Sequence, residues 1–419
     1  MINKESINQY KNIYNYIFLL GIFLLPSSVF LGLIFLIPSC IFGISISKVK
    51  FFKDKYNLAL IICSIIIIFS TLINTFSNLQ IPKSLISKDS WVGIFNWIPM
   101  FFIFFGSQTF LDNYKKRKSF AFVLVAGSIP IVVTGLGQYF FNWNGPFETL
   151  NGLIIWYQRE IKNQEGLSGL FNHANYAGCW LNIVLPFGFA LVNYRNNVLS
   201  KNISKFILVG LLTCIILTNS RSAWLGSFSS IFLLFGISSL RWIIPILVFI
   251  FIIIFCCINP IFGIPFQIFM QKLIPDNIWL EFTPLGFKGL DVSRLEIWES
   301  AINHLMQNLL WGTGHGSFTN MFLAETGYWK GHSHNLFLEL SISYGLLVGI
   351  ILTTFTLFIL IFSIKNLLIN QRKNLNLIFD KALIISLIVL LSSQMIDIQY
   401  FDGRIATLSW IILAGARNI

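Results

Sequence analysis

Four side chains in this largely apolar sequence have the chemistry of a site for anion binding and proton transfer. Arg221 and Arg294 carry guanidinium groups, which bind phosphate through paired N–H donors, and His332 and His334 carry imidazoles, which accept protons near neutral pH. Three of the four lie in a polar segment, residues 260–334. We therefore expect the chemistry of this protein at the surface that this segment occupies.

Arg294 stands at the start of a predicted helix. Ser293 and Glu296 have the spacing of a capping box, in which each side chain bonds a backbone N–H group at the helix start. The apolar residues that follow at helical spacing are Leu295, Trp298, Ile302, Leu305 and Leu309. We expect an amphipathic helix that lies on the membrane domain through this face. An anion would stabilise Arg294 at the positive end of the helix dipole.

Arg221 has a similar place in the sequence. Asn219 or Ser220 can cap a helix that begins at Ser222, so Arg221 would lie at its N-terminus. The exposed N–H groups and the guanidinium together would form a phosphate site. The alternative, which stays open, is an interfacial arginine that extends its charge toward the lipid headgroups.

The histidines allow three interpretations. His334 precedes an apolar run, with Ser333 as a candidate cap, and we expect it to act as the general base because Asn335 and the helix fix its direction. His332 is the competing base, or both are solvated loop residues. A metal held by His315, His332 and His334 is the third interpretation, but the sequence has no carboxylate or thiolate cluster nearby. We predict no metal and no cofactor.

Two further groups of polar residues lie elsewhere in the sequence. Asn172 precedes an apolar run and is either its helix cap or a substrate-binding side chain. Asp397, Asp402 and Arg404 are interpreted as a surface ion pair and are left out of the predicted site.

The rest of the chain has the composition of a membrane protein. It is 55% hydrophobic and 11% charged, with a mean hydropathy of +0.74, so an ordinary globular domain is excluded. Apolar runs near the length that spans a bilayer occur at 13–25, 28–47, 57–75, 91–111, 119–141, 174–193, 206–219, 222–239, 242–259, 335–364, 382–396 and 405–418. The sequence predicts an all-α, polytopic membrane protein of about twelve transmembrane helices. Residues 13–47 form either two spans or one kinked helix.

The domain organisation and orientation follow from the loops. We expect one polytopic domain over residues 1–419, with residues 260–334 as a long extracytoplasmic insertion that holds the amphipathic helix. With both termini cytoplasmic, the inner segments contain 19 of the 29 Lys and Arg residues but 4 of the 17 acidic ones. This positive charge fits anionic lipid headgroups and argues against nucleic-acid binding. The six cysteines lie in or beside spans, and no disulfide is predicted.

The order of these motifs resembles the O-antigen ligase and O-antigen polymerase superfamily. The matching segments are Asn172–Tyr176, Thr218–Trp224, Ser293–Leu295 with Trp298, Gly312–Phe318, and His334–Leu336 with Gly345 and Leu346. The resemblance covers residues 170–350, and the hydropathy layout extends it to the whole chain. His332 is a departure, because it adds a second histidine two residues before His334.

The resemblance implies a metal-independent glycosyltransferase in the bacterial inner membrane. It implies transfer of a glycan from an undecaprenyl-diphosphate carrier to a glycan or lipid-linked acceptor during assembly of cell-surface polysaccharide such as lipopolysaccharide. Arg221 and Arg294 would bind the diphosphate, and His334 would act on the acceptor. The sequence does not separate an O-antigen ligase from a polymerase, and a transporter of bicarbonate or another small anion is the alternative from a different class.

The predicted orientation can be tested with single cysteines at Asn113, Lys288 and Asn370. We expect a membrane-impermeant maleimide to label the cysteine at 288 in intact spheroplasts and to spare those at 113 and 370. The charge distribution puts position 288 outside and the other two positions inside. The reverse labelling pattern would overturn both the orientation and the placement of the site.

Overall fold

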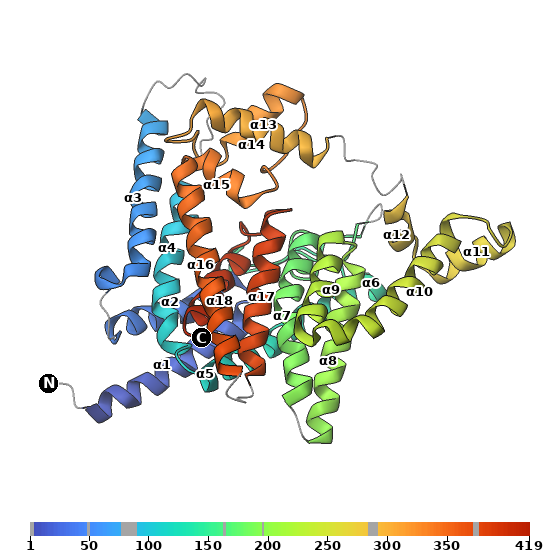
Figure 1. Cartoon of the computed structure of the whole chain (residues 1–419), viewed down its shortest axis with the longest axis horizontal. Coiled ribbons are helices and arrows are strands. Elements are labelled where there is room, and N and C mark those ends of the chain that lie inside the picture. The colour runs from blue at the N-terminus through green and yellow to red at the C-terminus, as the bar shows by residue number, and fades with distance from the viewer. Residues whose placement is uncertain are drawn as a thin grey trace. The chain divides into compact units, whose positions relative to one another are not determined.

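The structure is a computed structural model that describes residues 4–47, 51–76, 90–161, 165–194, 197–283, 292–371 and 377–419. These residues are helical apart from loops and one short pair of strands, which confirms the expected all-α polytopic fold (Figure 1). The chain divides into two compact units, one formed by Met1–Gly127 with Val292–Ile419 and the other by Ser128–Asp291. The prediction of a single domain stays a prediction.

Lys288, one of the positions chosen for the labelling test, lies outside the described residues. Ala324 is in the same predicted insertion and is exposed, so a cysteine at this position can replace the one at 288.

The first unit contains the two ends of the chain. Its elements are α1 (Lys4–Leu24), α2 (Val29–Ser45), η1 (Phe51–Lys53), α3 (Lys55–Phe76), α4 (Val92–Ser107), η2 (Gln108–Phe110), α5 (Tyr114–Gly127), α13 (Arg294–Gln307), α14 (Ser317–Thr326), α15 (Leu336–Tyr344), α16 (Leu346–Gln371), α17 (Ile378–Gln394) and α18 (Gly403–Arg417). Residues 13–47 form two helices, α1 and α2, that pack on each other, and the Ser28 side chain accepts a hydrogen bond at the start of α2.

Helix α18 is the centre of the first unit. It packs on α4, α16 and α17, and nearly all of its side chains are buried (Figure 1). Small residues allow this close approach: a Cβ atom added at Gly415 would lie 2.8 Å from the Leu383 side chain of α17. The apolar C-terminal helix is therefore a packed core element rather than a lipid-facing one.

A buried ion pair fixes α5 to α17. The Arg117 guanidinium donates to both carboxylate oxygens of Asp380 at 2.7 and 2.9 Å, and also to the carbonyl groups of Leu111 and Asn418 at 3.0 and 3.2 Å. Because every charge here has a partner, the pair is compatible with burial. Removal of one member would leave an uncompensated charge, which destabilises a fold by roughly 3–5 kcal/mol.

The predicted amphipathic helix exists as α13, but its buried face differs from the prediction. Ile297, Ala301 and Leu305 pack in one apolar cluster with side chains of α14 and α15, whereas Leu295 and Ile302 are 73% and 47% exposed. The helix has two apolar stripes, and helical spacing alone does not indicate which one packs on the protein. Of the predicted face, Leu305 packs in this cluster, whereas Leu295 and Ile302 do not, so the expectation is wrong for these two residues.

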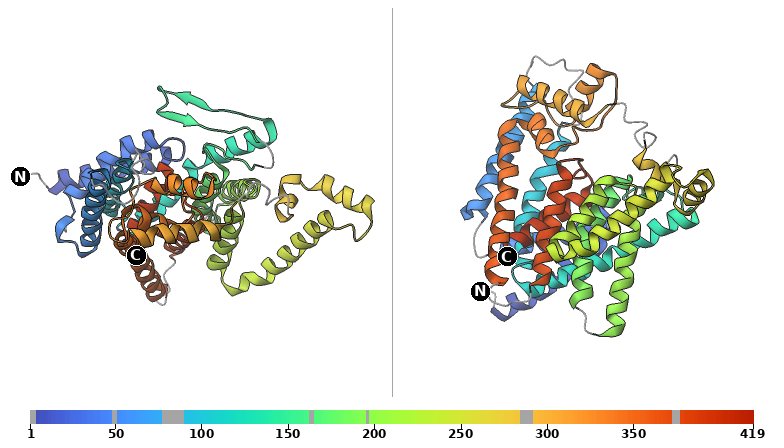
Figure 2. Two further views of the ribbon diagram at one scale, coloured as in Figure 1. Left: turned by 90° about the horizontal axis from the view of Figure 1, so that it is seen from above. Right: turned by 45° about the vertical axis from the view of Figure 1, so that its right-hand side comes forward.

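The second unit consists mainly of antiparallel helices and one hairpin. Its elements are α6 (Ile129–Phe141), β1 (Phe147–Thr149), β2 (Ile154–Trp156), α7 (Ala174–Tyr194), α8 (Val198–Leu217), α9 (Arg221–Phe235), η3 (Ile237–Ser239), α10 (Leu240–Ile258), α11 (Ile264–Leu273), α12 (Asp276–Trp279) and η4 (Leu280–Phe282). Strands β1 and β2 pair antiparallel, with Glu148 opposite Ile155 (Figure 2). The side chain of Gln138 on α6 accepts hydrogen bonds from the N–H groups of Ser168 and Gly169, so it anchors the segment that follows the hairpin.

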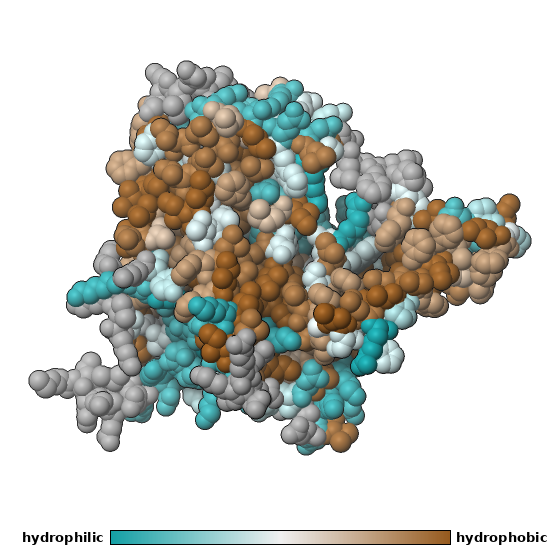
Figure 3. Space-filling view, viewed as in Figure 1, coloured by the Kyte–Doolittle hydropathy of each residue, from teal (hydrophilic) through white to brown (hydrophobic). Residues whose placement is uncertain are grey.

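Every predicted span coincides with one or two helices. Among the described residues, seven segments are long and apolar enough to cross a membrane: Tyr56–Phe76, Val92–Phe110, Tyr114–Phe141, Ala174–Tyr194, Val198–Leu217, Ile237–Ile258 and Leu346–Asn370. Helices α2, α9, α17 and α18 are shorter, with 15 to 17 residues. In the first unit, apolar side chains gather over α3 and α16 and hydrophilic ones over α13 and α14 (Figure 3).

The predicted span 335–364 is not one helix. It is divided at Gly345 into α15 and α16, and Gly345 has a φ angle of +96° that a residue with a side chain rarely adopts. A Cβ atom at this position would also collide with the Leu310 carbonyl oxygen. The sequence stays apolar through the break, so hydropathy did not reveal it.

Candidate active site

The loop before α15 contains the central residues of the candidate site. Asn335 is the helix cap: its Oδ1 accepts from the Leu338 N–H at 3.2 Å, and its Nδ2 donates to the Met395 carbonyl at 3.1 Å. The predicted cap, Ser333, is wrong. The left-handed backbone of His334, with φ 54°, turns the chain just before the helix and puts the extended cap conformation at Asn335.

The buried Ser333 and Glu339 hold this loop against the first turn of α15. The Ser333 N–H donates to the Glu339 carboxylate at 2.9 Å, and the Ser333 hydroxyl donates to the Asn335 carbonyl at 3.1 Å. Glu339 is 3% exposed and Ser333 is fully buried. These bonds restrict the backbone on both sides of His334. A histidine in a solvated loop would not need such restriction, so the bonds argue against that interpretation.

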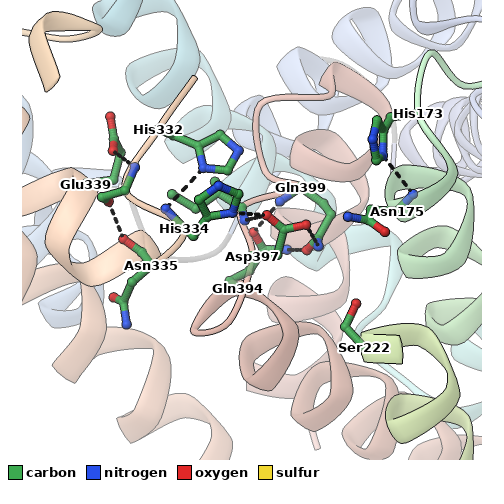
Figure 4. Close-up of polar contacts among 12 residues, drawn as sticks. His173, Asn175, Ser222, His332, His334, Asn335, Glu339, Gln394, Asp397 and Gln399 are labelled. Carbon is green, nitrogen blue, oxygen red and sulfur yellow. Dashed lines mark hydrogen bonds and ion pairs between the residues drawn. The ribbon is translucent and has the colours of Figure 1, made fainter. Parts of the chain in front are cut away.

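His334 forms a hydrogen bond with a carboxylate that we did not include in the predicted site. Its Nδ1 lies 2.7 Å from Oδ1 of Asp397, and Figure 4 shows the two side chains pointing toward each other. The His334 side chain is 25% exposed, while that of Asp397 is 7% exposed. A carboxylate that accepts from Nδ1–H selects the tautomer in which Nε2 carries the lone pair. The imidazole is thus both oriented and reachable, as a general base must be.

Asp397 lies in the turn between α17 and α18, in a network of amides. Its Oδ2 accepts from the Gln399 side chain at 3.2 Å, and its Oδ1 also accepts from the Ile398 N–H at 3.1 Å. Burial raises the pKa of Asp397, but the hydrogen bond to His334 and the charges of His334, His332 and Arg294 outweigh it and lower this pKa to about 2. Asp397 is therefore ionised at neutral pH. The nearby Asp402 and Arg404 form the expected ion pair, at 2.8 Å, but it is not at the surface, because the two side chains are 10% and 5% exposed.

Arg294 and His332 both lie near the pair of His334 and Asp397. Arg294 is the first residue of α13, and the predicted capping box is present: Ser293 and Glu296 exchange bonds of 3.3 and 2.9 Å. Arg294 is exposed, and its charge contributes to the lowered pKa of Asp397. His332 lies beside His334 and uses its Nδ1 to accept from the His334 N–H at 3.1 Å (Figure 4).

The residues that could form a metal site differ from those that the sequence suggested. Among the described residues, His332, His334 and Asp397 offer ligand atoms within 4.8 Å of one another and could hold a metal ion. His315, which the sequence grouped with the other two histidines, instead lies beside Asn96 and Phe401. The carboxylate that the sequence lacked is supplied by Asp397. The hydrogen bonds occupy both Nδ1 atoms, and the Nε2 atom of His334 is left for a proton or for a metal ion, so the geometry is compatible with either role.

Arg221 and Asn172 lie in the second unit. Helix α9 begins at Arg221, one residue earlier than predicted; Ser220 occupies the cap position, but its side chain makes no capping bond. Arg221 is exposed at this N-terminus, as the anion-site hypothesis requires. Among the described residues the buried Oδ1 of Asn172 has no hydrogen-bond partner, so it does not cap α7. Instead His173 Nδ1 accepts from the Asn175 N–H at 3.1 Å, which leaves the substrate-binding role for Asn172 as a prediction.

These features define a helical membrane protein with an oriented histidine beside a cationic helix start. Residues 206–353 match the family model described as O-antigen ligase, which confirms the resemblance to the O-antigen ligase and polymerase superfamily. The matched region contains Arg221, Arg294, His332, His334 and Asn335, while Asn172 and Asp397 lie outside it. No curated protein matches the sequence. The matched family indicates membrane glycan chemistry of the ligase and polymerase type.

The role of Asp397 can be tested with Asp397→Asn, which keeps the shape of the side chain and removes its charge. We expect the initial rate of glycan transfer in purified membranes to fall at least about 100-fold, because the amide no longer selects the reactive tautomer or stabilises the imidazolium. Glu325→Gln is the matched control, since Glu325 forms another histidine–carboxylate pair, 3.2 Å from His304. Equal rates in Asp397→Asn and the natural protein would remove Asp397 from the site.

Proposed function

We propose that this protein is an O-antigen ligase-like glycosyltransferase of the bacterial inner membrane. It would move a glycan from an undecaprenyl-diphosphate carrier to an acceptor hydroxyl on the extracytoplasmic face. The observation that carries the proposal is the hydrogen bond of 2.7 Å between Asp397 and His334, and the loop of His334 lies in the family match. A residue that only anchors a loop needs no such orientation of its imidazole.

The reaction assigns one task to each group. The Nε2 atom of His334 takes the proton of the acceptor hydroxyl as its oxygen forms a bond to the anomeric carbon of the donor sugar. The bond between that carbon and the diphosphate oxygen breaks, and the diphosphate leaves with the bonding electrons. Asp397 stabilises the resulting imidazolium, which is the same task that a triad carboxylate performs.

The leaving group requires positive charge, because it departs as a polyanion. Arg294 at the start of α13 and Arg221 at the start of α9 supply guanidinium groups together with exposed helix N-terminal N–H groups. Preorganised donors of this kind supply a large share of catalysis in many enzymes. In this proposal Asn335 and His332 line the acceptor side, no metal takes part, and the guanidinium groups stabilise the charge.

Ligase and polymerase differ in the acceptor. A polymerase adds the glycan to another growing glycan, whereas a ligase adds it to a lipid-linked core. Surface glycans of cells without the protein distinguish them: loss of the chain-length ladder indicates a polymerase, and unlinked long glycan on its carrier indicates a ligase. Unchanged glycans would contradict both.

Conservative replacement of the arginines tests diphosphate binding. Arg294→Lys and Arg221→Lys should each lower transfer at least about tenfold, because lysine offers a point charge in place of a planar pair of donors. The transfer rate in membranes with equal amounts of protein is the measurement. Arg241→Lys in α10 is the control, and full activity of Arg221→Lys would return Arg221 to the class of interfacial arginines.

The two neighbouring histidines should differ in importance. We expect His334→Ala to lower transfer roughly 10²–10⁴-fold and to leave lipid-linked donor accumulating, while His332→Ala is milder, because the Asp397 carboxylate orients the His334 imidazole, whereas Nδ1 of His332 accepts from the His334 N–H. His304→Ala is the control. EDTA should leave the natural activity unchanged. A larger loss in His332→Ala would move the base to His332, and loss of activity in EDTA would favour the metal site at His332, His334 and Asp397.

A further inference from the structure

Helix α11 of the second unit has an apolar stripe that the described part of the chain leaves uncovered. Four side chains with helical spacing share this face: Phe266, Phe269, Met270 and Leu273. Phe266, Phe269 and Leu273 are 39%, 55% and 58% exposed. The helix packs chiefly on α10, and the two helices meet at a sharp turn (Figure 1). The stripe therefore requires an apolar partner other than the described residues.

The length of α10 determines the depth at which α11 begins. The candidate membrane span Ile237–Ile258 has 22 residues, and at about 1.5 Å per residue it is about 33 Å long. The hydrocarbon core of a bilayer is about 30 Å thick. Ile258 therefore lies close to the boundary between acyl chains and headgroups, and a tilt of α10 would only move it deeper.

Two glutamines hold α11 at this depth. The Gln267 side chain donates to the Cys257 and Ile258 carbonyls at 3.1 and 3.0 Å, and the Gln271 side chain donates to the Cys257 carbonyl at 2.8 Å. The last carbonyl groups of a helix have no partner within the helix, and lipid offers no water to satisfy them. The glutamine amides take the place of water, so the turn between α10 and α11 is compatible with an apolar environment.

The composition of the turn and of α11 supports the same location. Residues 259–275 contain a single charged side chain, Lys272, in the last turn of α11. The ring of Phe262 in the turn is 70% exposed and lies 5.5 Å from that of Phe266, so it extends the stripe. A short helix with an apolar, aromatic face and one cationic residue is typical of helices that lie in a membrane interface.

We propose that α11 is an interfacial helix whose stripe inserts into the lipid leaflet where α10 ends. The charge distribution predicts that this is the outer leaflet. The stripe would lie roughly 5–10 Å deep among the first carbons of the acyl chains, and Lys272 would reach the lipid phosphates. A stable interface between proteins buries about 800 Å² on each partner, so four side chains fit lipid better than a second copy of the chain. The proposal does not depend on the proposed function.

Spin labels on single cysteines measure the depth of α11. The full-length protein, with one copy in each lipid nanodisc, carries a nitroxide at Phe266→Cys or Phe269→Cys. Lys272→Cys is the matched control on the same helix, and Ala324→Cys is an exposed control on α14. The six natural cysteines are buried, so the natural protein gives the background. We expect labels at 266 and 269 to collide more often with oxygen, which concentrates among acyl chains, than with a water-soluble nickel chelate. Labels at 272 and 324 should show the reverse.

A charge in the stripe provides a second measurement. With the label at Leu273→Cys, Phe266→Asp should shift its collisions from oxygen toward the nickel chelate, whereas Phe266→Leu, which keeps the stripe apolar, should not. More frequent collisions with the nickel chelate at 266 and 269 would overturn the proposal, because the stripe would then face water. Rare collisions with both reagents would overturn it as well, because protein would cover the stripe. Dipolar broadening between labels at 269, seen only when several copies share a liposome and together with loss of oxygen collisions, would assign the stripe to a second copy instead.

Discussion

The hydrogen bond between His334 and Asp397 is the contact on which the candidate site depends. It joins the loop before α15 to the turn between α17 and α18, two segments that are 63 residues apart in the sequence. The bond from Asn335 to the Met395 carbonyl joins the same two segments. Since the Asp397 carboxylate is almost fully buried, water competes weakly for these bonds, and they are stronger than they would be at the surface.

This arrangement couples anion binding to proton transfer. The charges of His334, His332 and Arg294 all act on Asp397. These four residues of the first unit therefore interact electrostatically as one group. In the proposed function, the donor diphosphate binds at Arg294 and the acceptor hydroxyl binds at His334, so both substrates meet beside the same buried carboxylate.

Local patterns in the sequence predicted most of the helices and several of the site residues. The capping box at Ser293 and the helix start at Arg221 follow from short-range rules, and the structure has both within one residue. Asp397 was missed because its role arises from a tertiary contact with His334, and an acidic residue after an apolar run equally suits an ion pair with a neighbour in the sequence, as Asp402 with Arg404 demonstrates. The buried face of α13 was missed because the choice between two apolar stripes depends on α14 and α15.

Helix α15 is a rigid spacer of nine residues between two fixed points, the Asn335 cap and the Gly345 turn. Each residue of an α-helix adds about 1.5 Å and about 100° of rotation. One inserted or deleted residue would therefore rotate the His334 loop around the helix axis, away from the turn that holds Asp397. The site would be disrupted even though all of its side chains were still present. Natural variation within α15 should accordingly change residue identity far more readily than length, and an engineered insertion here would act as a helical phase shift.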